Sequence, residues 1–189
     1  MKNFRLLALF LSTSLLITSC SKDDAPTPVN EEELITTVKI TLTEEGGQTI
    51  TLISKDLDGD GPGAPVITPV GGATLVAGTT YTGTATFLNE AVNPAEDITE
   101  EVSAEGADHQ VFYQLPATLG TITYDDVDAN GKPIGLEFTL VAAATGASNN
   151  LTVTLIHLPN KSAVGVANGN MTNAGGNTDA VVTFPITVQ

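Results

Sequence analysis

The sequence predicts an all-β fold, an antiparallel β-sandwich of the immunoglobulin-like type with one short acidic helix. Several stretches alternate apolar and polar residues with the two-residue period of strands that bury one face. Tryptophan is absent, aromatic residues make up only 5% of the chain, and 18 glycines supply turns. Seven or more short strands with half-polar faces favour a sandwich over a doubly wound α/β fold.

The expected strands begin with a hairpin, in which residues 38–42 and 50–52 alternate on either side of a glycine-containing turn. Pro185, in the last strand, has no backbone N–H and falls on the outward phase. We therefore expect that strand at an edge of its sheet. Alternation predicts the other strands over residues 81–87, 134–140, 151–155 and 182–188, with shorter ones over 65–69, 111–115 and 120–124.

A single helix is expected between Asn93 and Gly106. Asn93 suits the N-cap, Pro94 the first helical position and Gly106 the end, and acidic residues in the first turn face the positive end of the helix dipole. A narrow apolar stripe predicts that the helix lies across one end of the sandwich; it consists of Ala95, Ile98 and Val102. Residues 165–176, rich in asparagine and glycine, are expected to form a long loop.

The first 20 residues are typical of an exported, lipid-anchored protein. Lys2 and Arg5 precede an apolar run over 6–17 that is too short to span a bilayer and suits a cleaved signal. The run ends in LITSC, which resembles the lipobox of bacterial lipoproteins and implies that Cys20 is acylated and becomes the mature N-terminus. The alternative is a plain secretory signal with a chance cysteine. We expect a signal peptide over 1–19, a lipidated cysteine and proline-containing tether over 20–33, and one sandwich domain over 34–189.

Composition and charge limit the partners of the mature chain. Removal of residues 1–19 leaves 22 acidic against five basic residues, so the formal net charge changes from −15 to −17. A surface this acidic repels nucleic acid and anionic lipid headgroups, and it leaves cations and basic partners. Cys20 is the only cysteine, so its lipidation excludes a disulfide, a thiolate metal site and a cysteine nucleophile from the folded part.

Three longer segments resemble small flavobacterial outer-membrane lipoproteins; they are NPAEDITEEV, the HxPNK pattern and NAGGNTD. Such sequences often carry the label of type 1 periplasmic binding fold superfamily proteins, which implies a large α/β fold, whereas the alternation predicts β structure. The acidic residues directly after Cys20 also resemble the surface-export signal of lipoproteins from Bacteroidetes. The resemblance implies a lipid anchor in the outer membrane, with the cell surface as the first expectation and the periplasmic leaflet as the second. It implies no site residues.

Two acidic turns are candidates for Ca²⁺. In the first, Asp56, Asp58 and Asp60 place carboxylates at alternate positions. The twelfth position of this loop is Ile67 rather than a glutamate, so a complete EF-hand is excluded. The alternative is a solvated acidic turn.

The second acidic turn contains Asp126, Asp128 and Asn130. It has Glu137 at the twelfth position and matches the whole EF-hand pattern. Strands rather than helices are expected on both sides, and Asn130 followed by Gly131 is a strong hairpin signal by itself. A plain turn is therefore favoured over Ca²⁺ at this position.

The acidic helix and the two histidines suggest a transition-metal site. If the helix packs over the end of the sandwich where His157 completes its strand, four side chains converge on one ion, most plausibly Zn²⁺ or Fe²⁺. They are Glu101, Glu105, His109 and His157. The alternative is a solvated acidic face with two unrelated histidines.

No arrangement for nucleophilic catalysis is recognised, since the chain has no G-x-S-x-G elbow and no serine placed by spacing beside a histidine. The sequence therefore predicts a non-catalytic surface lipoprotein that binds a cation, a metal complex or a protein partner, for example alongside an uptake receptor. A structural or adhesive surface protein with Ca²⁺-stiffened loops is the alternative, and a hydrolase is a third.

Overall fold

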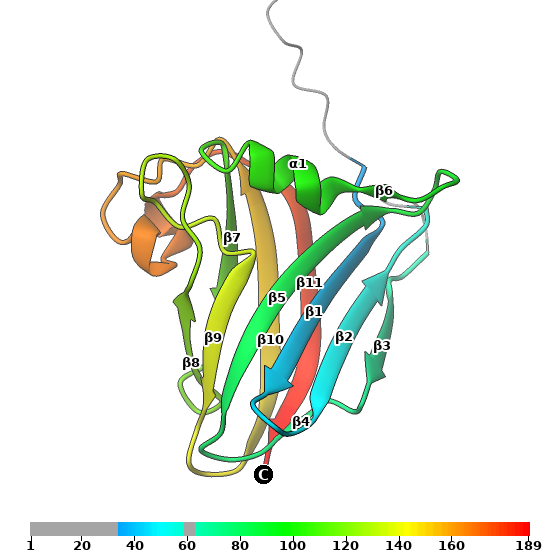
Figure 1. The fold of residues 1–189 in the computed structure, drawn as a ribbon, viewed down its shortest axis with the longest axis vertical. Helices are drawn as coiled ribbons and strands as arrows, with labels where there is room; N and C mark the ends of the chain where they lie inside the picture. Colours follow the sequence, from blue (N-terminus) through cyan, green and yellow to red (C-terminus); the bar gives the residue numbers. More distant parts are fainter. Residues whose placement is uncertain (1–33, 59–62) are drawn as a thin grey trace, which may run out of the picture. The chain divides into compact units, whose positions relative to one another are not determined.

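The computed structural model describes residues 34–58 and 63–189, and these form two β-sheets that pack face to face (Figure 1). The strands of the larger sheet are β1 (Thr37–Glu44), β2 (Thr49–Lys55), β3 (Val66–Val70), β5 (Thr80–Asn89), β6 (Glu96–Asp97), β8 (Gly120–Tyr124) and β9 (Glu137–Ala142). Those of the smaller sheet are β4 (Thr74–Leu75), β7 (His109–Gln114), β10 (Ala147–His157) and β11 (Asn177–Val188). The predicted all-β sandwich with one short helix is confirmed.

The sheet order combines hairpins with pairings between strands that are distant in the sequence. The larger sheet runs β3-β2-β1-β5-β9-β8 with β6 on β5, and the smaller sheet runs β4-β11-β10-β7. All pairs between these strands are antiparallel except β4 with β11, which is parallel over two residues. Alternating residues from both sheets meet in one apolar core, in which Phe87, Phe138 and Phe184 are fully buried.

Pro185 lies on the exposed face of β11, opposite Asn150 of β10. On the other side of β11, the described pairing with β4 involves only Thr187 and Val188. In the sheet order, β11 lies between β4 and β10. At Pro185, however, β11 pairs only with β10, so its other side is a sheet edge there. The missing N–H is tolerated there because no ladder bond to β4 reaches that residue.

The helix starts later than its sequence suggested. Helix α1 spans Ile98–Ala104, and Asp97 caps it by accepting a hydrogen bond from the backbone N of Thr99 at 3.0 Å. Asn93 and Pro94 lie outside the helix, so the prediction that they start it is wrong. Helix formation before Ile98 competes with strand pairing, because Glu96 and Asp97 form β6 and pair with β5.

Helix α1 lies across the upper end of the sandwich, as expected (Figure 1). Its Ile98 and Val102 side chains are buried in the core between the sheets. Thr99 fixes it to β5, because its Oγ1 accepts from Phe87 N at 2.9 Å and donates to Phe87 O at 3.2 Å.

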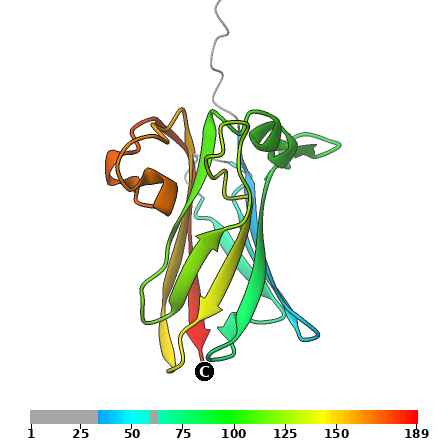
Figure 2. The same ribbon diagram turned by 60° about the vertical axis from the view of Figure 1, so that its left-hand side comes forward.

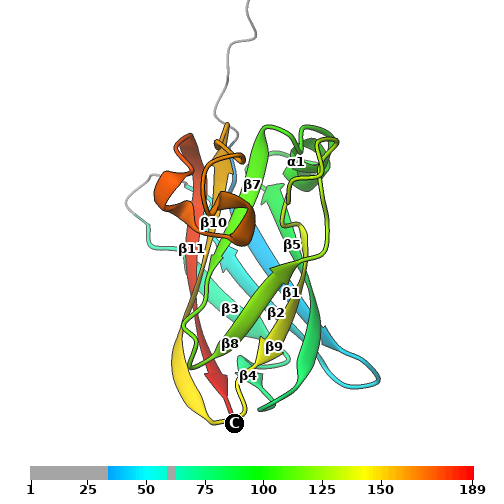
Figure 3. The same cartoon turned by 90° about the vertical axis from the view of Figure 1, so that its left-hand side faces the viewer.

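The expected loop over 165–176 contains two short 3-10 helices, η1 (Val166–Asn168) and η2 (Met171–Asn173). It packs on the outer face of the smaller sheet at the same end as α1 (Figures 2 and 3). Val166 and Ala174 of this loop form a second apolar cluster with Phe112 and Ile156. A further difference is that β9 begins at Glu137, three residues after the start that alternation suggested.

The predicted signal peptide, Cys20 and tether lie outside the described residues. Within residues 34–58 and 63–189, no helix has the length and apolar character needed to cross a membrane.

The pairing of β5 with β9 provides a test of the core. Gly83 lies opposite Phe138, and a Cβ at Gly83 would stand 2.2 Å from the Phe138 ring, which also packs on Tyr113. We expect Gly83→Ala to lower the free energy of unfolding by about 1–3 kcal/mol, because the buried ring has no space to move into. Urea unfolding measures this.

The matched control is Thr82→Ala, at an exposed position of the same strand, which is expected to change the free energy of unfolding by less than about 0.5 kcal/mol. Combining Gly83→Ala with Phe138→Leu should recover part of the loss. Equal stability of Gly83→Ala and wild type would contradict the observed packing.

Candidate metal centre

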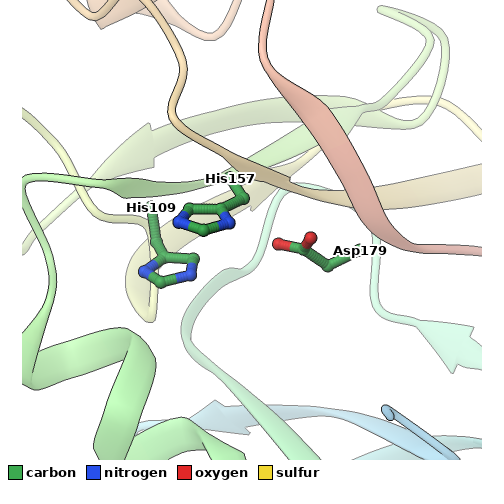
Figure 4. A group of neighbouring side chains, drawn as sticks. All are labelled: His109, His157 and Asp179. Carbon is green, nitrogen blue, oxygen red and sulfur yellow. The ribbon is translucent and has the colours of Figure 1, made fainter. Parts of the chain in front are cut away.

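The two histidines of the chain lie side by side at the upper end of the smaller sheet. His109 is the first residue of β7 and His157 the last of β10, and they are direct partners in the antiparallel register. Val111 and Leu155, two residues further into the same strands, belong to the core, so both histidines are on the inner face. Their rings stack with centroids 4.6 Å apart and planes 9° from parallel (Figure 4).

Asp179 of β11 is the third member of the group. One ligand atom from each of His109, His157 and Asp179 lies within 4.8 Å of the others. Figure 4 shows the carboxylate directed at the stacked rings. The three side chains thus come from three adjacent strands of one sheet.

A β-bulge aims Asp179 inward. Leu155 pairs with Ala180 and Ile156 pairs with Thr178, so Asp179 is the extra residue of β11 at this point. In β11 the even-numbered residues from Ala180 to Val188 pack against the core, and strict alternation would turn Asp179 outward. The bulge breaks this alternation and puts two consecutive side chains near the inner face.

The end of helix α1 orients His109. Glu105 is the C-cap of α1, and its carbonyl oxygen lies 3.2 Å from His109 Nδ1. A proton on Nδ1 that is donated to this carbonyl leaves the lone pair on Nε2 for an ion, which is the usual arrangement of a metal-binding histidine. His109 is 1% exposed, so this orientation is fixed by burial as well.

Leu158 links the two histidine-bearing segments. Its backbone N donates to the Asp108 carbonyl at 2.6 Å, which ties the end of β10 to the residue before His109. Leu158 has a φ of 53°, a left-handed conformation that a non-glycine residue adopts at a cost of roughly 1–2 kcal/mol. The chain thus bears backbone strain directly beside His157.

Imidazole nitrogens and a carboxylate are ligands that suit Zn²⁺ and Fe²⁺. With bonds of about 2.0–2.1 Å, two ligands of a tetrahedral ion stand roughly 3.4 Å apart. The observed group, within 4.8 Å, is wider by up to about 1.4 Å, and parallel rings do not aim both lone pairs at one point. Binding therefore requires the half-buried His157 and Asp179 to turn toward the buried His109.

Of the four residues expected to share a metal, the structure brings together His109 and His157. The carboxylates of Glu101 and Glu105 are not in the group, and both side chains are exposed. Glu105 contributes its backbone carbonyl instead, and Asp179 supplies the carboxylate.

The turn over 125–136 holds its acidic side chains by hydrogen bonds within the protein. Asp126 accepts from the backbone N of Gly135, Leu136 and Glu137 at 2.7, 2.8 and 3.1 Å. Asp128 Oδ1 accepts from the N of Asn130 and Lys132 at 2.8 and 2.9 Å. The oxygens suggested for Ca²⁺ thus face N–H donors, which supports the plain turn.

Lys161 takes the place of a cation beside Asp128. Its ammonium donates to Asp128 Oδ2 at 3.0 Å, to the Pro133 carbonyl at 2.9 Å and to the Gly106 carbonyl. All three N–H groups are used, and the side chains of Lys161 and Asp128 are 6% and 1% exposed. This buried ion pair joins the segment that follows α1, the turn over 125–136 and the loop after β10.

Burial and hydrogen bonding act in opposite directions on this pair. Burial disfavours the charged carboxylate, but hydrogen bonds from Lys132 N, the Lys161 ammonium and Asn130 N outweigh it and hold the pKa of Asp128 below its ordinary value. Burial also lowers the pKa of Lys161, against the opposing attraction of Asp128. Nearby, burial is the main cause that raises the pKa of Tyr124 to about 12.

The first acidic turn follows β2. Asp58 is exposed and accepts from Gly63 N at 3.0 Å, and a hydrogen bond with the Asp56 side chain is the main cause of its lowered pKa. Asp60 lies outside the described residues, so the structure does not test the complete Ca²⁺ hypothesis for this turn.

A shallow groove of about 520 Å³ separates α1 from the adjoining part of the larger sheet. Three of the acidic side chains that line it are Asp97, Glu100 and Glu137, and hydroxyls of threonine and serine complete its polar lining. It contains none of the three residues of the histidine group. The groove is therefore a separate acidic surface.

Comparisons with protein-family models, with curated proteins and with solved structures gave no match for this chain.

Sequence reasoning missed Asp179 and Lys161. Alternation turns Asp179 outward, and no sequence signal marks the one-residue bulge that reverses it. Lys161 follows a strand end and a proline, where a solvated lysine is the ordinary expectation. The sequence indicated a buried lysine only through its excess of acidic residues, which makes an ion pair with a carboxylate more probable.

The ion pair generates a prediction on stability. Lys161→Met keeps the length of the side chain but leaves the buried Asp128 carboxylate without its ammonium partner. We expect a loss of about 3 kcal/mol in the free energy of unfolding at pH 7, measured by urea denaturation. Lys132→Met is the control, because Lys132 gives its backbone N to Asp128 and this donor is retained.

The same pair has a defined pH dependence. Because the pKa of Asp128 is lowered in the folded state, its stabilisation is complete above the ordinary value of about 3.9 and is lost as the pH falls through the folded-state pKa. The stability difference between wild type and Lys161→Met should therefore shrink below about pH 4. A difference that stays constant down to pH 2 would show that the carboxylate charge is not involved.

Proposed function

We propose that this protein is a lipid-anchored outer-membrane lipoprotein that binds a divalent transition metal, Zn²⁺ or Fe²⁺, without catalysing a reaction. The observation that carries the proposal is the grouping of His109, His157 and Asp179 within 4.8 Å at one end of the sandwich. These residues are separated by up to 70 positions in the sequence, and they meet through strand pairing and a bulge rather than by local proximity.

The contacts that hold His109 in place favour a metal site over a chance pairing of two histidines. His109 is held by a backbone carbonyl of α1 and by burial, as expected of a ligand whose tautomer is fixed. The end of the sandwich that carries it is braced by the Lys161–Asp128 ion pair. A rigid first ligand with two half-exposed partners suits an ion that enters from solvent.

The proposed lipid anchor and the net charge of the chain are consistent with capture of cations at the outer membrane. Acylation of Cys20 would hold the domain at the outer membrane, with the surface-exposed face as the first expectation, and residues 21–33 would act as a spacer. A formal charge of −17 on the mature chain raises the local concentration of cations. In this proposal, the protein binds the metal at the cell surface and transfers it to an uptake receptor.

Metal binding is tested with three substitutions. Asp179→Asn, His157→Gln and His109→Ala should each weaken Zn²⁺ binding by about 100-fold or more in isothermal titration calorimetry, since each removes one ligand. His157 and Asp179 are half-buried, so their variants are expected to fold even if the fully buried His109 tolerates no change.

The controls are Glu101→Gln and Glu105→Gln, which remove nearby negative charge but no member of the group. Both should bind Zn²⁺ within about threefold of wild type. No heat of binding with the wild-type protein for either Zn²⁺ or Fe²⁺ would refute the proposal.

The anchor is tested separately. In cells, Cys20→Ala should release the protein from the outer-membrane fraction, whereas the neighbouring Ser21→Ala should leave it anchored. Mass spectrometry of the wild-type protein should find an acylated N-terminal cysteine. An uncleaved and unmodified N-terminus would show that the lipobox assignment is wrong.

A further inference from the structure

We infer that the metal held by His109, His157 and Asp179 keeps a coordination position for an anionic ligand from solution, so that the bound metal also binds a small anion. This inference rests on the metal site proposed above. It concerns the class of ligand that completes the site.

The number of protein ligands is the first support. Zn²⁺ in closed, structural sites takes four protein ligands, whereas sites with three keep an open position, and a set of two histidines and one carboxylate is also typical of open Fe²⁺ sites. Among the described residues, the group contains three such side chains. One position on a tetrahedral ion, and more on a larger coordination sphere, remains for another ligand.

Within residues 34–58 and 63–189, no fourth histidine or carboxylate joins the group. On the core side, the next inward residues of β7 and β10 are Val111 and Leu155, both fully buried and apolar. From above, α1 presents Ile98 and Val102 to the core, while Glu101 and Glu105 are exposed. The residue opposite His157 on β11 is Asn177, whose amide is a poor ligand for Zn²⁺ or Fe²⁺.

Exposure indicates where the added ligand enters. His109 is fully buried, whereas His157 and Asp179 are half-buried and Asn177 is exposed. The solvent side of the site is therefore the rim between β10 and β11. A ligand that approaches there reaches the metal without opening the core.

Charge selects the class of that ligand. Two neutral imidazoles and one carboxylate around a divalent ion leave the site with a net charge of +1. An anionic oxygen or nitrogen donor neutralises this charge, whereas a second cation is repelled. Small carboxylates, the usual partners of metal ions in solution, fit this requirement.

The experiment uses the mature, full-length lipoprotein in detergent, loaded with Co²⁺ as a spectroscopic substitute for Zn²⁺. Azide serves as a monodentate anion and acetate as a carboxylate. We expect both to shift the visible Co²⁺ absorption bands in a saturable manner, with at least a tenfold lower half-saturation concentration than sodium chloride. The double variant Glu101→Gln/Glu105→Gln should respond in the same way.

The outcomes separate the two proposals. If Co²⁺ gives no protein-dependent spectrum, the metal site itself is refuted, and the inference falls with it. If the spectrum forms but ignores both anions, the metal site stands and the open position is refuted. If only the double variant responds, a helix carboxylate closes the site in the wild type, and the inference is again overturned.

Discussion

A single ammonium group organises the end of the molecule on which the proposed site depends. Lys161 donates to the carbonyl of Gly106, to the turn that contains Asp128 and to Pro133, and it does so away from solvent. Gly106 precedes His109 by three residues, and His157 precedes Lys161 by four. The same interaction thus fixes the entry to β7 and the exit from β10, and the register between these strands then places the rings together.

The fold was predictable because its determinants are local. Alternation identified the long strands, and β8 has the bounds that the sequence suggested. The helix start was not predictable, because Asn93 and Pro94 carry good capping signals but Glu96 and Asp97 pair with β5. That pairing depends on a partner elsewhere in the chain. The short parallel pairing of β4 with β11 was not predictable either, since a strand of two residues shows no alternation of apolar and polar residues.

The candidate site was predictable only in part. The histidines could be matched because both fall near strand or helix ends, where chain direction places them at one end of a sandwich. The partners chosen for them came from the helix, on the condition that it packs over the end of the sandwich where His157 completes its strand. The helix does lie there, and Ile98 and Val102 of the predicted apolar stripe face the core, since burying apolar area is favourable and burying a carboxylate is costly. The carboxylate that lies beside the histidines is that of Asp179 in β11, where a one-residue bulge shifts the alternation of inward and outward side chains.

The extra residue in β11 is separable from the core positions of the strand. Because Asp179 belongs to no pair of the ladder, removing one codon there would restore uninterrupted alternation without changing Phe184, Ile186 or Val188 in the interior. The acidic donor would be lost while the scaffold survived. A deletion of one residue would therefore remove the carboxylate from the group and leave the apolar positions of β11 in register with the core.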